Sequence, residues 1–95
     1  MELVIDGAAL PAAEAVHDLF ARALTLPAWY GRNLDALYDV LTERGEPLRL
    51  LVRNREALAA GLGEYAEDLL RTLVDAAAET ARLEAEAEHK KEDSE

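Results

Sequence analysis

Two aspartates one helical turn apart are the residues of this chain best placed to do chemistry. Asp35 and Asp39 are four positions apart, so a helix would place both carboxylates on one face, with Tyr38 and Thr42 beside them. Like charges at this spacing repel by roughly 0.2–0.5 kcal/mol on an isolated helix, and no Lys or Arg stands four positions away to offset the repulsion. Three interpretations stay open from this chemistry alone: a solvated acidic face, a surface for a basic partner, and a carboxylate metal site.

A loop rich in aromatic residues comes directly before this helix. Pro27 and Gly31 mark it as a loop, and Trp29 and Tyr30 lie between them. We expect Tyr30 to be a core residue, whereas a tryptophan in such a loop is a candidate anchor for an interface. Because Trp29 would adjoin the two aspartates, the loop and the helix together favour a binding site for a basic partner.

Other kinds of functional site find little support. The chain has no cysteine, its one serine is Ser94, and neither His17 nor His89 has an evident catalytic companion. We expect both histidines to be structural or solvent-exposed. The glycines around Gly31 and Gly61 match no phosphate-binding loop. The sequence therefore predicts neither a nucleophilic enzyme nor a nucleotide site, and no cofactor.

Apolar spacing predicts the elements that position these residues. Residues 3–5 and 48–52 are short apolar runs typical of buried strands. Helical spacing predicts four helices. They are residues 11 to about 25, a helix capped by Asn33, a short helix over 56–60 capped by Asn54 and stopped by Gly61 and Gly63, and residues 64–79. Residues 83–87 alternate Leu and Ala with Glu, the period of an edge strand, although Ala and Glu favour helix. We expect a third strand there.

The last helix has an apolar and an acidic side. The apolar side is predicted to face inward and consists of Ala66, Leu69, Leu70, Leu73 and Ala77. Asp68, Asp75 and Glu79 fall on the outward side, a stripe that usually is a solvated face. A strand, helices and a strand in this order predict a right-handed crossover in an α/β fold with a parallel sheet.

Length and charge limit the class of protein. The 95 residues, 51% of them hydrophobic, predict a single domain over residues 1–88, followed by a disordered acidic tail over 89–95. The net charge of −10 makes nucleic acid a poor partner and favours a basic protein. The amino terminus has only three consecutive large apolar residues, so we expect neither a signal peptide nor a membrane span, and a cytoplasmic location.

Residues 26–42 form the string LPAWYGRNLDALYDVLT, which resembles the signature of the barstar family. The resemblance extends over about residues 2–88 through the order of the elements and their apolar spacing. It implies a three-stranded parallel sheet packed with about four helices. It also implies one-to-one inhibition of a basic microbial ribonuclease, barnase-like or otherwise guanyl-specific, by a protein that is monomeric when free. Binding of a different basic protein and a metal-assisted enzyme are the alternatives.

The resemblance also assigns partner-binding positions, among which Asp39 would take the place of an RNA phosphate. Asp75 corresponds approximately to a peripheral contacting acid. The full set is Trp29, Gly31, Asn33, Asp35, Tyr38, Asp39, Thr42 and Asp75. This chain departs from the family's namesake where Trp29 replaces a tyrosine and where Tyr38 and Arg44 each replace a tryptophan.

Overall fold

The structure is a computed structural model in which residues 1–87 are described. Its centre is a three-stranded sheet in the order β1 (Glu2–Asp6), β2 (Leu48–Arg53) and β3 (Leu83–Ala87), with both pairings parallel. The helices are α1 (Ala13–Ala23), α2 (Leu34–Glu43), α3 (Arg55–Leu62) and α4 (Glu64–Glu79), and a short 3-10 turn, η1 (Gly7–Ala9), follows β1. The predicted α/β fold, with its parallel sheet and four helices, is confirmed.

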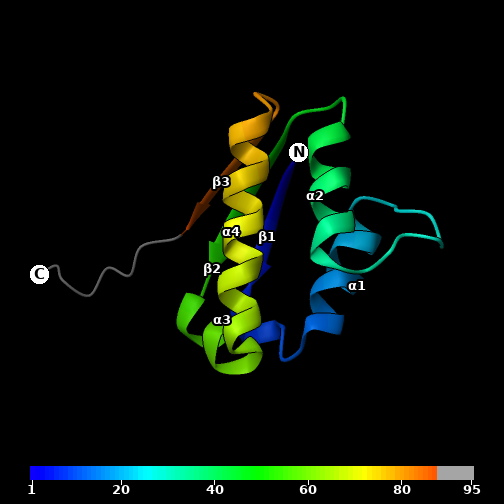
Figure 1. Ribbon diagram of the computed structural model, residues 1–95. Helices are drawn as coiled ribbons and strands as arrows, with labels where there is room; N and C mark the ends of the chain where they lie inside the picture. The colour runs from blue at the N-terminus through cyan, green and yellow to red at the C-terminus, as the bar shows by residue number, and fades with distance from the viewer. Residues whose placement is uncertain (88–95) are drawn as a thin grey trace, which may run out of the picture.

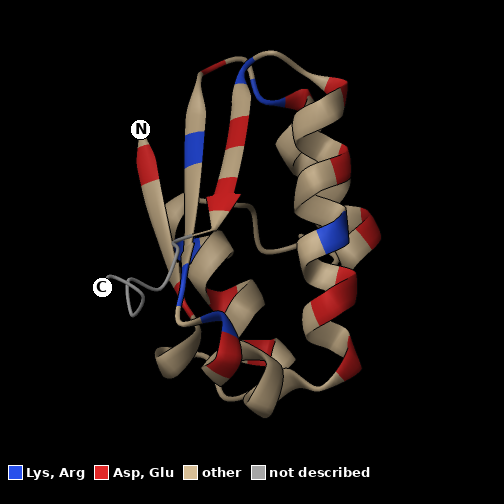
Figure 2. Cartoon of the chain, turned by 90° about the vertical axis from the view of Figure 1, so that its left-hand side faces the viewer, with Lys and Arg blue, Asp and Glu red and all other residues tan. Residues whose placement is uncertain are grey.

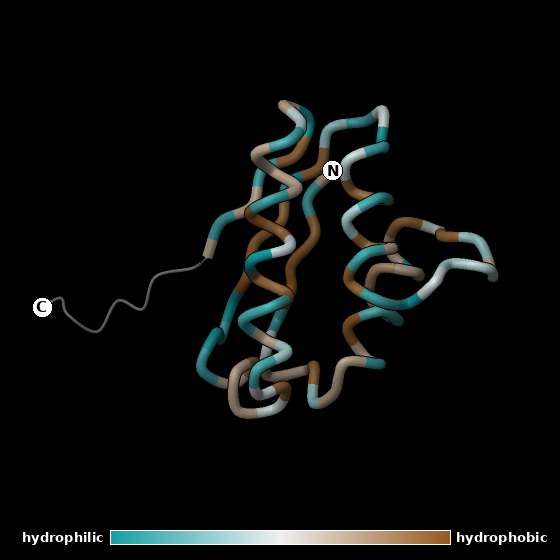
Figure 3. The backbone as a smooth tube through the Cα atoms, in the orientation of Figure 1, coloured by the Kyte–Doolittle hydropathy of each residue, from teal (hydrophilic) through white to brown (hydrophobic). Residues whose placement is uncertain are grey.

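The sheet has one face toward the helices and one face of largely charged side chains. Figure 1 shows α4 in front of the sheet, α1 and α2 together at one side, and α3 at the end where β1 and β2 finish. Along β2, Leu48, Leu50 and Val52 are buried while Arg49 and Arg53 are exposed. Figure 3 shows the hydrophobic stretches along the strands and the alternating hydrophobic and hydrophilic stretches along α4.

The helices bury the apolar stripes that their spacing predicts, except that in α4 Ala76 is buried where Ala77 is expected. In α1 Val16 and Phe20 are fully buried, and in α2 Leu37 and Leu41 are buried. The fourth helix buries Ala66, Leu69, Leu73 and Ala76, while Leu70 and Ala77 are only partly buried against the core.

The third strand shows tertiary structure overriding local propensity. Ala and Glu favour helix, yet residues 83–87 pair with β2 in the register Leu48↔Leu83 to Val52↔Ala87. Leu83 is 4% exposed, so the strand is held by its first apolar residue and by the ladder to β2. The predicted third strand is confirmed, and the alternative of an extended last helix is wrong.

Two predicted helix boundaries need correction. Asn54 stands before α3, but its side chain makes no capping hydrogen bond. Its backbone has the left-handed φ of 56°, and its Nδ2 donates instead to Asp6 Oδ1 at 2.6 Å. Of the two glycines predicted to stop α3, Gly61 is wrong, because the helix runs past it to Leu62, and Gly63 is confirmed, because the helix ends where Gly63 adopts a φ of 62°.

Two predictions concern residues at the end of the chain. The domain end at residue 88 and the disordered tail over 89–95, with His89, lie outside the residues that the structure describes. Within residues 1–87, every helix is too short or too polar to cross a membrane.

Candidate protein-binding site

The start of α2 is fixed by a cap that also ties down the preceding loop. Asn33 Oδ1 accepts a hydrogen bond from the Ala36 N–H at 2.8 Å, which confirms the predicted cap. The same side chain donates through Nδ2 to the Gly31 carbonyl at 3.4 Å. A Cβ at Gly31 would lie 3.1 Å from the Ala36 Cβ, so glycine lets the loop pass close to the helix. Asn33 and Gly31 therefore shape the site from within.

The outward face of α2 carries the two aspartates. Leu37 and Leu41 are buried against the core, and Asp35 and Asp39 are exposed on the other side. The Thr42 hydroxyl donates to the Tyr38 carbonyl at 2.9 Å, inside its own helix. The predicted acidic face therefore exists, but the Thr42 hydroxyl already has an acceptor.

A groove of about 490 Å³ separates this face from α4. It is lined by Leu34, Asp35, Tyr38, Thr72, Asp75, Ala78 and Glu79. Asp75 and Glu79, which the sequence suggests belong to a solvated stripe, thus lie across the groove from α2. Helical spacing places each acidic pair on one side of its own helix, but only the packing of α2 on α4 brings the two stripes together.

Tyr38 joins the two walls of the groove. Its side chain lines the groove together with Asp75 and Glu79, and its ring packs against the core. The pKa of Tyr38 is raised first by burial, then by the nearby Glu79 carboxylate, and further by Asp75 and Asp39. The phenol therefore stays protonated and adds no negative charge to the carboxylates of the groove.

The aromatic loop places its two rings differently. Tyr30 is 7% exposed and belongs to the core, as predicted, whereas Trp29 is 84% exposed. Figure 1 shows the loop between α1 and α2 projecting from the side of the molecule. An exposed indole ring on a projecting loop is an apolar surface that a partner could cover.

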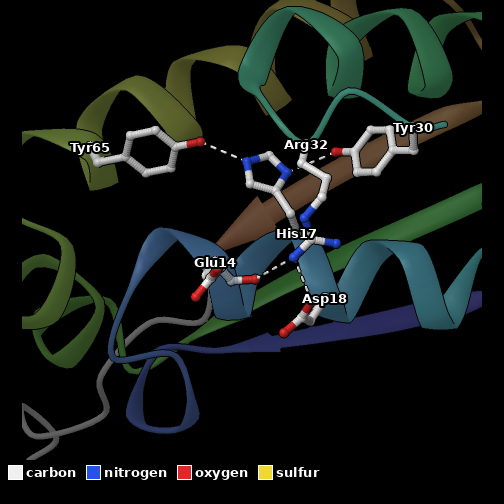
Figure 4. A network of polar contacts seen from close by, with 6 residues as sticks. All are labelled: Glu14, His17, Asp18, Tyr30, Arg32 and Tyr65. Carbon is white, nitrogen blue, oxygen red and sulfur yellow. Dashed lines mark hydrogen bonds and ion pairs between the residues drawn. The ribbon is translucent and has the colours of Figure 1, made fainter. Parts of the chain in front are cut away.

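A buried histidine holds this loop to two helices. His17 of α1 is 2% exposed, and its Nδ1 lies 2.8 Å from the Tyr30 hydroxyl while its Nε2 lies 2.7 Å from the Tyr65 hydroxyl (Figure 4). Burial lowers the pKa of His17, and the Arg32 cation lowers it further, against the opposite effect of Asp18. The imidazole is therefore neutral near pH 7, donating to one tyrosine and accepting from the other.

A second contact fixes the end of the loop. Arg32 has a left-handed φ of 56°, and its guanidinium reaches back to α1, where it pairs with Asp18 and donates to the Glu14 carbonyl at 3.3 Å (Figure 4). The links from His17 span 13 and 48 residues of sequence. Local spacing carries no signal for partners so far apart, so sequence reasoning identified His17 only as structural or exposed.

The metal interpretation gains no support from the geometry. Within residues 1–87, no group of three or more His, Cys, Asp or Glu side chains is arranged so that it could hold a metal ion. Two carboxylates alone are few ligands for a hard cation. The solvated acidic face and the surface for a basic partner are the interpretations that stay open.

Comparison with known proteins identifies the family. The family model named Barstar, described as barnase inhibitor, matches residues 1–92. The chain belongs to the barstar family. A protein of Bacillus subtilis (strain 168) with the name "Putative ribonuclease inhibitor YrdF" is 41% identical to the chain over 76 residues, which are 79% of this chain and 84% of that protein. In this barstar-family chain, Trp29, Asp35 and Asp39 are exposed on the loop and helix that carry the signature.

The eight positions assigned by resemblance fall into two groups in this barstar-family structure. The side chains exposed to a partner are Trp29, Asp35, Asp39 and Asp75. Within the site, Asn33 and Thr42 make hydrogen bonds, Gly31 passes close to Ala36, and Tyr38 lines the groove. Their contact with a partner remains a prediction.

Proposed function

We propose that this barstar-family chain inhibits a basic, guanyl-specific ribonuclease one-to-one by covering the active site of that enzyme. The observation that carries the proposal is the single surface on which Asp35 and Asp39 are exposed next to a loop whose Trp29 is 84% exposed. The description of the family as barnase inhibitor and the name of the Bacillus subtilis relative support a ribonuclease as the partner.

The carboxylate of Asp39 would act as a stand-in for an RNA phosphate. A ribonuclease must bind a phosphate with cationic groups, and Arg–carboxylate pairs can form two parallel charge-assisted hydrogen bonds. Around Asp39, the acids Asp35, Asp75 and Glu79 add negative potential that attracts a basic cleft. Trp29 would supply apolar contact area at the edge of the interface.

The contacts behind the loop make the surface ready to bind. His17 fixes Tyr30, and Arg32 fixes the loop end to α1, so little of the loop has to be ordered when a partner arrives. Binding affinity increases when less conformational freedom is lost. In this function the chain would break no bond, and we propose that it is not an enzyme.

The setting of this function is proposed from composition. The absence of cysteine suits a reducing compartment, so we propose that the chain acts in the cytoplasm and is monomeric when free. The matching alternative is a barstar-family binding module whose partner is another basic protein, since fold alone does not fix the partner.

Titration against an enzyme tests the proposal. A fixed amount of a guanyl-specific ribonuclease is mixed with increasing amounts of the chain, and residual RNA cleavage is measured. We expect cleavage to fall linearly and to end at one equivalent, and Asp39→Ala to restore it. Undiminished cleavage by every guanyl-specific ribonuclease tried, at a large excess of the chain, would overturn the proposal and leave the other basic partner.

A further inference from the structure

We propose a second protein-binding site at the free edge of β3, on the other side of α4 from the groove with α2. The site fits an extended segment of a partner protein in which basic side chains alternate with apolar ones. This site does not depend on ribonuclease inhibition, because its residues lie on β3, β2 and the opposite side of α4.

The backbone of β3 has unused hydrogen-bonding groups on one side. The Leu48 N–H donates to the Arg82 carbonyl at 2.8 Å, which fixes the parallel ladder so that the even-numbered residues of β3 bond β2. The N–H and C=O groups of Ala85 and Ala87 then point away from the sheet. Within residues 1–87, β3 pairs with β2 alone, so this edge can accept a further strand.

The side chains of β3 on the helix-facing side leave a space. Ala85 and Ala87 are too short to cover α4, and an apolar groove of about 210 Å³ runs beside them. It is lined by Val52, Arg55, Leu70, Leu73, Val74, Ala85, Glu86 and Ala87. Ala85 and Ala87 are only half-buried here, whereas Leu3 and Ile5, on the same face of the sheet at its other edge, are buried. Val74 of α4 is 61% exposed at this groove. The β3 edge is therefore the incompletely covered one, and apolar side chains of an added strand would fill it.

The opposite face of β3 determines the charge of the partner. Arg49 of β2 lies 3.2 Å from Glu86, 3.9 Å from Glu84 and 3.8 Å from Glu2, measured between guanidinium nitrogen and carboxylate oxygen. One guanidinium thus serves three carboxylates, and the Glu84 side chain is 74% exposed. Figure 2 shows the acidic bands of β3 next to the basic band of β2. An added strand with Lys or Arg beside Glu84 and Glu86 would complete this charge pattern.

A second copy of the chain does not fit this edge. If two copies of the chain paired through their β3 edges with two-fold symmetry, the two β3 strands would be antiparallel. Glu84 and Glu86 of one copy would then lie close to Glu84 and Glu86 of the other copy. Like charges opposite each other destabilise a strand pair, and each copy carries a net charge of −10. The charge pattern therefore selects a basic segment of another protein.

Synthetic peptides test the site. The blocked peptide Lys-Val-Lys-Val-Lys-Val is titrated into the full chain while amide hydrogen exchange is followed, with Glu-Val-Glu-Val-Glu-Val and Lys-Lys-Lys-Val-Val-Val as controls. We expect only the alternating basic peptide to slow exchange of the Ala85 and Ala87 amides, which point away from β2. Two variants should each weaken its binding by about tenfold or more: Glu84→Lys, which reverses a charge, and Val74→Asp, which makes the groove polar.

A third variant separates edge pairing from general charge attraction. Ala85→Pro removes an N–H that faces away from β2, a position where an edge strand tolerates proline. It should also abolish the protection of the remaining Ala87 amide. Asp39→Ala should leave it unchanged, and Ala85→Pro should leave ribonuclease inhibition unchanged. Equal binding of the acidic peptide, or binding that leaves Ala85 and Ala87 unprotected, would overturn this site without affecting the proposed inhibition.

Discussion

At the scale of the residue, Asp39 is predicted to have opposite effects on folding and on binding. It is exposed on α2 four positions from Asp35, so its charge repels a like charge in the free protein. Asp39→Ala should leave the free energy of unfolding unchanged or raise it by roughly 0.2–0.5 kcal/mol, helped by the helix propensity of alanine. In the proposed complex the same change leaves buried basic groups of the enzyme without their anion. Such a loss generally costs about 2–5 kcal/mol of binding free energy.

Paired measurements of melting and binding check this prediction. The complex of the family's namesake is itself a known case of such a charge pair, and the size of the expected loss of binding comes from it. The opposite signs of the effects on unfolding and on binding follow from this structure. Glu84→Gln is the matched control, since it removes one acid from the far face of the sheet and should preserve inhibition. Full inhibition by Asp39→Ala would show that Asp39 belongs to a solvated face, and a joint loss of melting temperature and binding would show a structural role.

At the scale of the elements, His17 makes the packing of α1, the aromatic loop and α4 sensitive to pH. Its pKa is lowered in the folded chain, so the unfolded chain binds more protons between the folded pKa and the ordinary value of about 6.5. The contribution of the neutral His17 side chain to the free energy of unfolding is therefore complete above about pH 6.5. It decreases as the pH falls from there through the folded pKa of His17. We expect the melting temperature to drop between pH 7.5 and pH 5.5.

Two glutamine variants isolate this effect. His17→Gln keeps a donor and an acceptor for the two tyrosines but does not titrate, so its melting temperature should change less over the same pH range. His89→Gln removes the other histidine of the chain and should behave like the parent. If the parent and His17→Gln lose the same stability between these pH values, another group is responsible.

The contact between η1 and α3 gives a prediction about glycine. A Cβ at Gly7 would lie 2.3 Å from the Asn54 carbonyl oxygen and 2.6 Å from the Leu58 nitrogen, both backbone atoms. Gly7→Ala should therefore lower the free energy of unfolding by about 1–3 kcal/mol or more, because backbone has to move.

Gly45 supplies the control for this prediction. A Cβ there meets nothing within 4 Å, and its φ is not left-handed, so Gly45→Ala should be neutral or stabilising by about 0.4–1 kcal/mol. Denaturant unfolding of the two variants measures both effects. A loss from Gly7→Ala no larger than from Gly45→Ala would show that η1 can move away from α3 at little cost.

The elements could be predicted from sequence to the extent that their signals are local. Buried stripes such as Leu37 with Leu41, and the Asn33 cap, depend on spacing within one helix. The prediction for Asn54 is wrong because its side chain hydrogen-bonds Asp6, 48 positions away, in place of its own helix. The positions of Asp75 and Glu79 beside α2 and the partners of His17 are non-local in the same way, and spacing cannot reveal them.

At the scale of the whole molecule, the charge distribution gives both proposed sites the same preference for basic partners. The net charge is −10, and acids line both the groove between α2 and α4 and the free edge of β3. The two surfaces lie on different sides of α4, so a partner on one would leave the other accessible (Figures 1 and 2). Both sites are predicted to favour basic partners, and the apolar element beside each, Trp29 or the Val74 groove, distinguishes what they bind.

Long-range charge should determine how fast a ribonuclease is captured. Salt screens charges over about 10 Å at 0.1 M, so the association rate with a basic ribonuclease should fall roughly tenfold or more between about 0.05 and 0.5 M salt. The dissociation rate should change less, because it depends on contacts already formed. Stopped-flow measurement of both rates checks this. Asp75→Asn should reduce the association rate at low salt more than the control Glu84→Gln, which removes the same charge from the far face of the sheet. An association rate that is indifferent to salt, or equally reduced by both variants, would show that the groove between α2 and α4 does not guide the encounter.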